Sequence, residues 1–152
     1  MLDGNASGRQ AHRLLQVGSV LFLFALLVGI AVPRFAVPRL GLSTHLLGLM
    51  QGIFLMVLGL VWPRLKLSGV QSTVGSSLAV YGCIAAWAAN LLAAVWGAGN
   101  SMLPLAAGSA RGSVLQETVI RVLLISAAGS LVSAAGLTVW GLRATRATDP
   151  PR

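Results

Sequence analysis

One stretch of the chain, Gly41–Pro63, constrains the fold most, because it is long and apolar enough to cross a lipid bilayer. A membrane-spanning helix needs about 20 mostly apolar residues. The stretch also contains His45 and Gln51, and polar side chains at membrane depth are costly and usually functional. At about 100° per residue, Gln51 points about 120° away from His45, so the two side chains are expected to face different neighbours.

The side of this helix that carries His45 is rich in glycine. Within about 60° of His45 on a helical wheel lie Gly48, Gly52, Met56 and Gly59. Glycines remove the layer of side chains, so a flat group or another helix can approach the backbone closely. The sequence alone is compatible with either a flat group or a helix against this glycine face.

The composition places the whole chain in a membrane. Of the 152 residues, 56% are hydrophobic and 9% are charged, whereas soluble domains carry about 25% charged residues. A water-facing surface cannot be built from this composition, so we expect an integral membrane protein in contact with the lipid bilayer. The net charge of +8 comes from basic residues spread between apolar runs. That spacing suits membrane topology and argues against nucleic acid as a partner.

Four apolar runs predict an all-α fold, an integral membrane four-helix bundle. The bundle is expected to span residues 14–142, between a polar N-terminal segment (1–13) and a polar C-terminal tail (143–152). The predicted helices are Leu14–Val32, Gly41–Pro63, Val74–Gly97 and Val114–Leu142.

The connections add detail to this outline. Ser43 or Thr44 is a candidate N-cap for the second helix, and Trp62 is a candidate anchor at the membrane interface. The longest connection, Ala98–Ser113, has room for a lid or a short interfacial segment.

The distribution of Lys and Arg predicts the orientation. The N-terminus, the second loop and the C-terminus together hold more of them than the first and third loops. The positive-inside rule therefore predicts that both termini are cytoplasmic. His45 and Glu117, near the starts of the second and fourth helices, would then share the outer side, where they can meet.

His45 has three interpretations. It can be a capping or interface histidine without chemistry, a proton carrier, or an axial ligand to haem iron. The chain contains no CxxCH motif, so a haem would be bound non-covalently.

Two further polar residues are candidates for the site. Glu117 is the only acidic residue within a predicted helix, and Arg121 follows four residues later, the favourable order for an ion pair. Glu117 is thus either half of a structural pair or a positioned acid or base. Asn90, inside the third helix, is expected to bond to another helix rather than face lipid.

Three segments of the chain resemble a known enzyme family. They are PRFAVPRLGLSTHLLGLMQGIFLMVLGLVWPRLKLS, QETVIRVLLISAAGS and WGLR. With them the chain resembles the hydroxylaminobenzene mutases, small bacterial membrane enzymes that turn hydroxylaminobenzene into 2-aminophenol. More distantly it is similar to styrene oxide isomerase, a membrane isomerase that opens an epoxide to an aldehyde.

The resemblance implies a cofactor and an assembly. The styrene oxide isomerases are trimers that hold haem b between protomers with a histidine as axial ligand, in a pattern like HxxxxxNG. His45 and Gln51-Gly52 occupy those places here. By resemblance, then, His45 is the iron ligand beside Gly48 and Gly52, and Gln51 is an amide that contacts the substrate.

The same resemblance implies further roles and a location. Asn90 is the nearest polar candidate for the substrate-binding position of the third helix, and Glu117 is a candidate to take or relay a proton. The expected protein is a homotrimeric, haem-dependent isomerase of a small aromatic substrate in the bacterial inner membrane, with its site between protomers.

Three other functions stay open on the sequence. The chain can be an epoxide isomerase of the styrene oxide type, a small four-helix transporter, or a non-catalytic haem-binding subunit. A transporter typically needs a carboxylate at mid-membrane, whereas Glu117 lies near a helix end.

Overall fold

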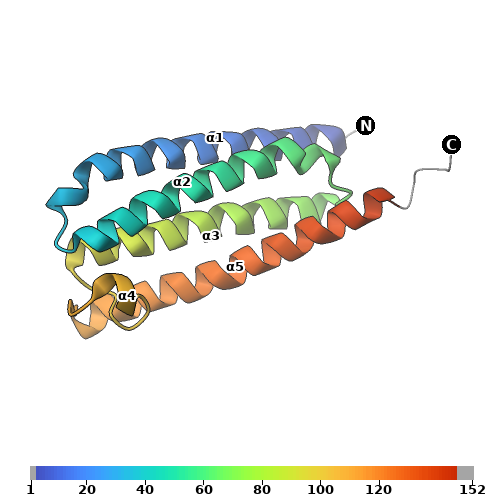
Figure 1. The fold of residues 1–152 in the computed structure, drawn as a ribbon. Coiled ribbons are helices and arrows are strands. Elements are labelled where there is room, and N and C mark those ends of the chain that lie inside the picture. Colours follow the sequence, from blue (N-terminus) through green and yellow to red (C-terminus); the bar gives the residue numbers. More distant parts are fainter. Residues whose placement is uncertain (1–2, 147–152) are drawn as a thin grey trace.

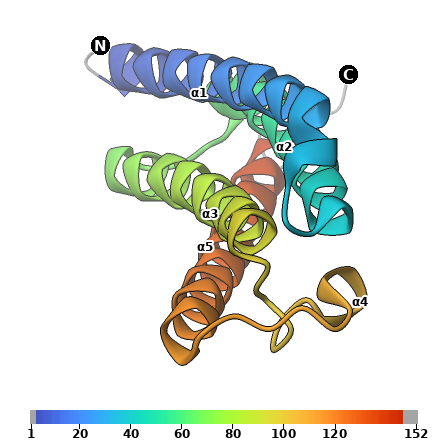
Figure 2. The same cartoon turned by 90° about the vertical axis from the view of Figure 1, so that its left-hand side faces the viewer.

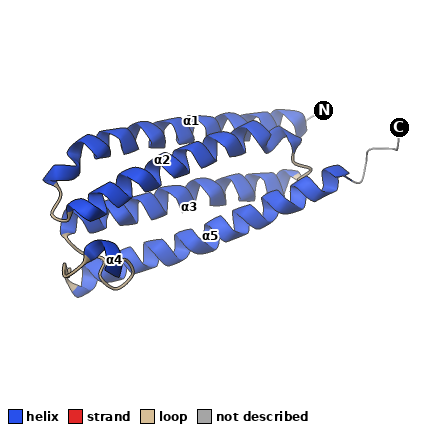
Figure 3. Ribbon diagram, viewed as in Figure 1, coloured by secondary structure: helices blue, strands red, loops and turns tan. Residues whose placement is uncertain are grey.

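A computed structural model describes the backbone of residues 3–146 and the side chains of residues 7–143, and every regular element in it is a helix (Figures 1 and 3). The elements are α1 (Asp3–Ala31), η1 (Val32–Arg34), α2 (Pro38–Val61), η2 (Trp62–Arg64), α3 (Gly69–Trp96), α4 (Pro104–Ala107) and α5 (Val114–Arg146). Helices α1, α2, α3 and α5 are each long and apolar enough to cross a membrane. The all-α prediction of four apolar helices is confirmed.

The four long helices run up and down in chain order. Helix α1 packs mainly on α2, α3 packs mainly on α5, and contacts between α2 and α3 join the two pairs (Figure 2). The start of α1 and the end of α5 lie at the same end of the molecule (Figure 1). This arrangement agrees with the predicted topology, while the side of the membrane on which that end lies remains a prediction.

Among the four long helices, α3 is the most buried and α5 the least covered. In the most apolar window of each helix, 56% of the α3 residues are buried but only 11% of the α5 residues. Most of the α5 surface is therefore not covered by the other helices of the chain.

Helix α1 begins at Asp3, whereas the sequence predicted a start at Leu14. The additional turns are held from outside the helix. The Nε2 of Gln10 donates a hydrogen bond of 2.7 Å to the Oγ1 of Thr73 in α3. This polar part of α1 is therefore fixed by a partner more than sixty residues away.

Helix α3 also begins earlier than predicted, at Gly69 rather than Val74. The side chain of Ser68 accepts from the backbone N–H of Gln71, whose side chain accepts from the N–H of Ser68. This capping box satisfies two of the N–H groups that a helix start leaves unpaired. At its other end α3 stops at Gly97, which adopts the left-handed conformation (φ 63°) that glycine accepts without strain.

Helix α2 starts at Pro38, so the prediction of Ser43 or Thr44 as its N-cap is wrong. Proline suits a first turn because its missing N–H would be unpaired there. Thr44 lies inside the helix, where its Oγ1 donates to the carbonyl of Leu40 at 2.8 Å. At the C-terminus of the chain, α5 extends to Arg146, and residues 147–152 of the predicted tail lie outside the described residues.

Trp62 is a core residue, so its prediction as an interface anchor is wrong. Its side chain is 1% exposed. The indole Nε1 donates to the Oγ of Ser72 at 2.9 Å and faces the Oε1 of Gln10 at 3.3 Å. Trp62 thereby ties η2 to both α1 and α3.

Helix α1 covers the glycine face of α2. A Cβ added to Gly52 would lie 2.9 Å from the carbonyl oxygen of Gly18, and one added to Gly59 would lie 2.9 Å from that of Ala11. Real Cβ atoms do not approach so closely, so the two backbones are in direct contact. Of the two expected occupants of this face, the structure contains the helix.

Candidate functional site

His45 lies on α2 where that helix faces the last turns of α1. Its Nδ1 lies 2.7 Å from the carbonyl oxygen of Ala25. Because a carbonyl only accepts, Nδ1 is the donor of this bond, and in the neutral form of the ring Nε2 carries the lone pair. Gly29 makes room for the ring, since a Cβ there would lie 2.6 Å from Nδ1.

An apolar hollow opens beside His45. It has a volume of about 520 Å³ and is lined by Leu26, Gly29, Ile30, Val32, Pro33, Leu42 and His45. Within the described part of the chain, no residue hydrogen-bonds to the Nε2 of His45. One nitrogen lone pair is therefore available at the edge of an apolar concavity.

The chemistry of this hollow fits haem better than a metal ion held by protein ligands alone. No group of three His, Cys, Asp or Glu residues that could hold a metal ion occurs among the described residues. Haem needs only one axial ligand from the chain, because the macrocycle supplies four nitrogens. An imidazole whose other nitrogen donates to a carbonyl is also the usual form of a metal-ligating histidine.

Gly48 and Gly52 do not fit the predicted role as a flat wall for haem. A Cβ on Gly48 would lie 2.6 Å from the Nε1 of Trp87 and 2.7 Å from the Cβ of Ala25. Gly52 is covered by α1, as described above. The apolar side chains of the hollow, and not these glycines, are the surface that a haem on His45 would meet.

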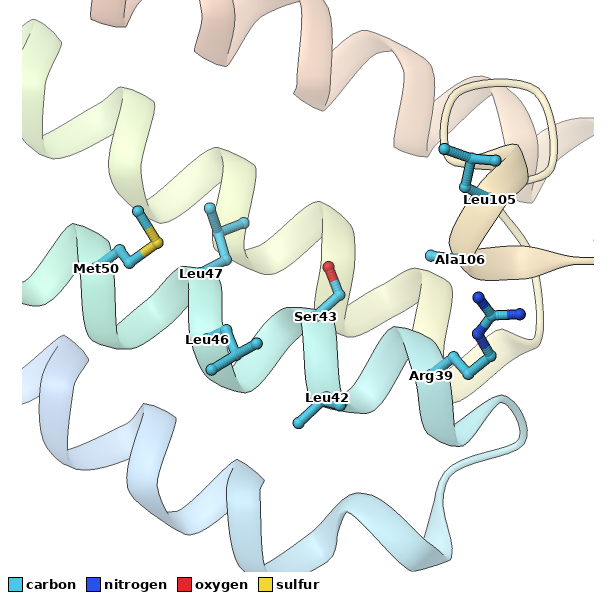
Figure 4. A pocket seen from close by; sticks show the side chains of 8 residues that line it. All are labelled: Arg39, Leu42, Ser43, Leu46, Leu47, Met50, Leu105 and Ala106. Carbon is cyan, nitrogen blue, oxygen red and sulfur yellow. The ribbon is translucent and has the colours of Figure 1, made fainter.

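A second hollow lies on another side of the same part of α2 (Figure 4). It has a volume of about 510 Å³ and is lined by Arg39, Leu42, Ser43, Leu46, Leu47, Met50, Leu105 and Ala106. Leu42 lines both hollows. Helix α2 therefore presents the imidazole of His45 to one hollow and the hydroxyl of Ser43 to the other.

Asn90 is connected to this second hollow through Ser43. The amide of Asn90 is buried, its Nδ2 donates to the carbonyl of Ala86 at 3.0 Å, and its Oδ1 accepts a long bond of 3.5 Å from the Oγ of Ser43. The prediction that Asn90 bonds to another helix is confirmed.

Gln51 is buried and lines neither of the two hollows. Among the described residues, its Oε1 has no hydrogen-bond partner, and the same holds for the Nε1 of Trp87. Such buried unpaired polar atoms are rare and call for a partner such as a water or a ligand. Among the buried side-chain atoms that the structure describes, one acceptor and one donor are thus unused.

In the part of the chain that the structure describes, Glu117 interacts with the connection before its helix, and neither with Arg121 nor with His45. Its two carboxylate oxygens accept from backbone and side-chain groups of Gly99, Asn100, Ser101 and Gly112. The interpretation of Glu117 as an ion-pair partner is therefore not supported, and its oxygens are occupied by the loop rather than free for a substrate proton.

Sequence reasoning missed two features of the site, Gly29 and the carbonyl of Ala25. Both fix the imidazole, and both lie in α1 rather than in the helix that carries His45. The signal in the sequence was a glycine near the end of the first apolar run, which is also common in ordinary helix packing.

Comparisons with known proteins cover nearly the whole chain. The model of the styrene oxide isomerase family matches residues 10–143. Hydroxylaminobenzene mutase HabB of Ectopseudomonas oleovorans is 48% identical over 93% of this chain and 88% of its own length. Hydroxylaminobenzene mutase HabA of the same organism is 38% identical over 82% of this chain and 93% of its own. No solved structure matches the chain.

The family match includes α2 with His45 and the whole of the two hollows. A match of this extent, together with relatives that are mutases, identifies the chain as an isomerase. The chain belongs to the styrene oxide isomerase family.

Proposed function

We propose that this protein is a membrane mutase that moves the hydroxyl group of an arylhydroxylamine, such as hydroxylaminobenzene, from nitrogen to the ortho ring carbon. The product would be a 2-aminophenol. The two relatives named as hydroxylaminobenzene mutases support the substrate class. The observation that carries the proposal is His45, whose Nδ1 is held by Ala25 while its Nε2 remains free beside an apolar hollow.

In this proposal His45 holds haem b as its axial ligand. When bound, the haem iron would supply a Lewis acid for the hydroxylamine oxygen and so weaken the N–O bond. The contribution of the chain is to fix the imidazole through Ala25 and to surround the hollow with Leu26, Ile30 and Leu42. Apolar walls keep water away from the reacting ring, which water would otherwise capture at other positions.

The reaction balances without an oxidant or reductant. The N–O bond breaks, a C–O bond forms at the ortho carbon, the ortho proton leaves and nitrogen regains a proton. The chain must therefore orient the aryl ring and exclude water rather than transfer electrons. Amide groups such as those of Gln51 and Asn90 are the proposed contacts for the amino end of the substrate.

We propose further that the site is shared between protomers of a homotrimer in the bacterial inner membrane. His45 and Ser43 serve different hollows of one protomer, and Asn90 is linked to the hollow of Ser43. A complete site then forms if one protomer supplies the imidazole and its neighbour supplies the amides. The mostly uncovered α5 leaves surface for such an assembly.

Two measurements on the purified protein test the proposal. Incubation with hydroxylaminobenzene should yield 2-aminophenol, and the protein should show a Soret band. The variant His45→Ala should lose both, whereas His12→Ala, which changes the other histidine of the chain at an exposed position of α1, should keep both. Absence of 2-aminophenol from the unaltered protein would contradict the proposed function.

The family match also supports a second candidate, the isomerisation of an epoxide to an aldehyde. Styrene oxide should therefore be offered in parallel, and the ratio of kcat/KM for the two substrates decides which is preferred.

Mixed trimers test the shared site. Protomers carrying His45→Ala and protomers carrying Gln51→Ala should each be inactive alone and should regain activity when they are assembled together. If the mixtures never recover activity, each site is built within one protomer.

A further inference from the structure

The connection between α3 and α5 is organised around one carboxylate, that of Glu117. Its Oε1 accepts from three backbone N–H groups, those of Gly99 (2.8 Å), Asn100 (3.3 Å) and Gly112 (3.2 Å). Its Oε2 accepts from the N–H (3.2 Å) and the Oγ (2.8 Å) of Ser101. Five donors, four from the start of the loop and one from its end, thus bond to a side chain in the first turn of α5.

The loop also contains bonds of its own, from the N–H groups of Met102 and Leu103 to the carbonyl of Gly99 and from the Nδ2 of Asn100 to the carbonyl of Gly108. Glu117 adds the bonds that join the first residues of the loop to Gly112 near its end. Gly99 adopts a positive φ of 102°, and a Cβ on Gly112 would collide with that of Ala98. Chain segments of this kind lose much conformational freedom when they are ordered. The hydrogen bonds to an ionised acceptor are about twice as strong as those between neutral groups, so Glu117 strongly restrains the two ends of the loop relative to each other.

The same loop carries α4, which forms a wall of the 510 Å³ hollow (Figure 4). Leu105 and Ala106 of α4 line this hollow opposite Leu42 and Ser43 of α2. Ala107 is buried in an apolar cluster at this end of the bundle. Glu117 itself does not line the hollow, so it can act there only through the loop.

We propose that Glu117 is a positioning residue that clasps the loop and so fixes α4 as the outer wall of the substrate hollow. It acts on the shape of the hollow and takes no proton from the substrate. This inference rests on the shared site of the proposed function, in which the His45 hollow of one protomer adjoins the Ser43 hollow of its neighbour, so that the aryl substrate contacts both.

Three variants at the start of α5 separate a clasp from a catalytic base. Glu117→Ala removes both oxygens, whereas Glu117→Gln keeps one acceptor oxygen for the loop but cannot act as a base. Thr118→Ala is the matched control, because its Oγ1 bonds only to the carbonyl of Val114 within α5. A clasp predicts graded effects in Glu117→Gln and Glu117→Ala, while a base predicts equal losses in both.

The kinetic readout is the division between KM and kcat. A loosened wall weakens binding of the ring in the ground state and the transition state alike, which raises KM and spares kcat. We expect KM for hydroxylaminobenzene to rise about tenfold in Glu117→Ala and by less in Glu117→Gln, because the lost hydrogen bonds are charge-assisted. A fall in kcat of equal size in both variants, at unchanged KM, would overturn the inference.

Hydrogen exchange of the loop gives a readout that does not depend on turnover. In Glu117→Ala the amides of Gly99, Asn100, Ser101 and Gly112 should exchange about tenfold faster, because their acceptor is gone. The amides of α3 and α5 should keep their protection, which shows that the fold is retained. Unchanged exchange in the loop would overturn the clasp, whatever the enzyme's substrate proves to be.

A thiol placed in the hollow separates the two proposals. Ser43→Cys adds a reactive group there, and the native Cys83 is buried, so labelling by N-phenylmaleimide reports on access to the hollow. Adding Glu117→Ala should speed labelling if α4 is released. If the unaltered protein does not turn over hydroxylaminobenzene, the proposed function is wrong. The role of Glu117 in fixing α4 is wrong only if Glu117→Ala leaves the labelling rate of Ser43→Cys unchanged.

Discussion

The Nδ1 of His45 lies 2.7 Å from the carbonyl oxygen of Ala25, so the orientation of the imidazole is set by a different helix from the one that carries it. Gly29, one turn further along α1, provides the space for this contact. The relationship makes α1 part of the site although it contributes no reactive side chain there.

Gly29→Ala should therefore damage the site without breaking the fold. The added methyl would lie 2.6 Å from Nδ1 and must displace the ring from the carbonyl of Ala25. Loss of a partner that orients a metal ligand typically costs about 10–100-fold in metal affinity or activity. The measurements are the Soret absorbance per protomer and the yield of 2-aminophenol.

Gly8→Ala is the control, because Gly8 lies on the same helix and has nothing within 4 Å of the added methyl. It should keep activity and gain a little stability, since alanine favours a helix over glycine by about 1 kcal/mol. Full activity in Gly29→Ala would show that the imidazole does not need the Ala25 contact.

Gln51→Met should raise stability and lower activity together. Methionine has a similar length without the buried Oε1 that lacks a partner. Removing an unpaired buried polar atom should stabilise the fold by about 1 kcal/mol. If this oxygen serves the substrate, turnover falls at the same time, so thermal unfolding and product formation are measured on the same preparation.

Gln16→Met provides the comparison for this trade between stability and activity, because Gln16 is exposed on α1. It should change neither quantity. A loss of stability in Gln51→Met would show that the Oε1 has a partner in the assembled protein that one protomer does not contain.

The sequence was sufficient for the number and order of the long helices, because four apolar runs with short connections leave few alternatives. The helix starts were less predictable. The first turns of α1 are polar and are fixed by Gln10 bonding to Thr73 of α3, a contact that no local pattern displays. Where a helix begins thus depended on a distant partner.

The candidate site was predictable in its chemistry but not in its neighbours. His45 could be singled out as a polar residue at membrane depth, whereas its partner is a backbone carbonyl, which every residue offers. The glycine face of α2 has the same sequence pattern whether a flat ligand or a helix covers it. In the structure a helix covers it, because the backbone of Gly18 in α1 contacts Gly52. The partners of Glu117 are mostly backbone amides, which also leave no pattern of side chains.

Trp62→Phe should destabilise the end of the bundle away from His45. Phenylalanine fills much of the space of the indole but removes the Nε1 donor that serves Ser72 and faces Gln10. The loss of this donor to buried acceptors and the smaller size of the ring together should lower the free energy of unfolding by about 2 kcal/mol. Trp140→Phe on α5, where the indole is 63% exposed, should cost far less in the same denaturation experiment.

Gly52→Ala distinguishes helix packing from haem contact on the glycine face of α2. The added methyl would lie 2.9 Å from the carbonyl oxygen of Gly18, so α1 and α2 must separate. Overpacking of this kind costs about 1–3 kcal/mol in the free energy of unfolding, whether or not a haem is bound. Gly129→Ala, which meets nothing within 4 Å in the protomer, is the control. The contrary outcome is that, in the absence of haem, Gly52→Ala has the same free energy of unfolding as the unaltered protein, and that only haem binding is weakened. The glycine face would then contact the cofactor and not α1.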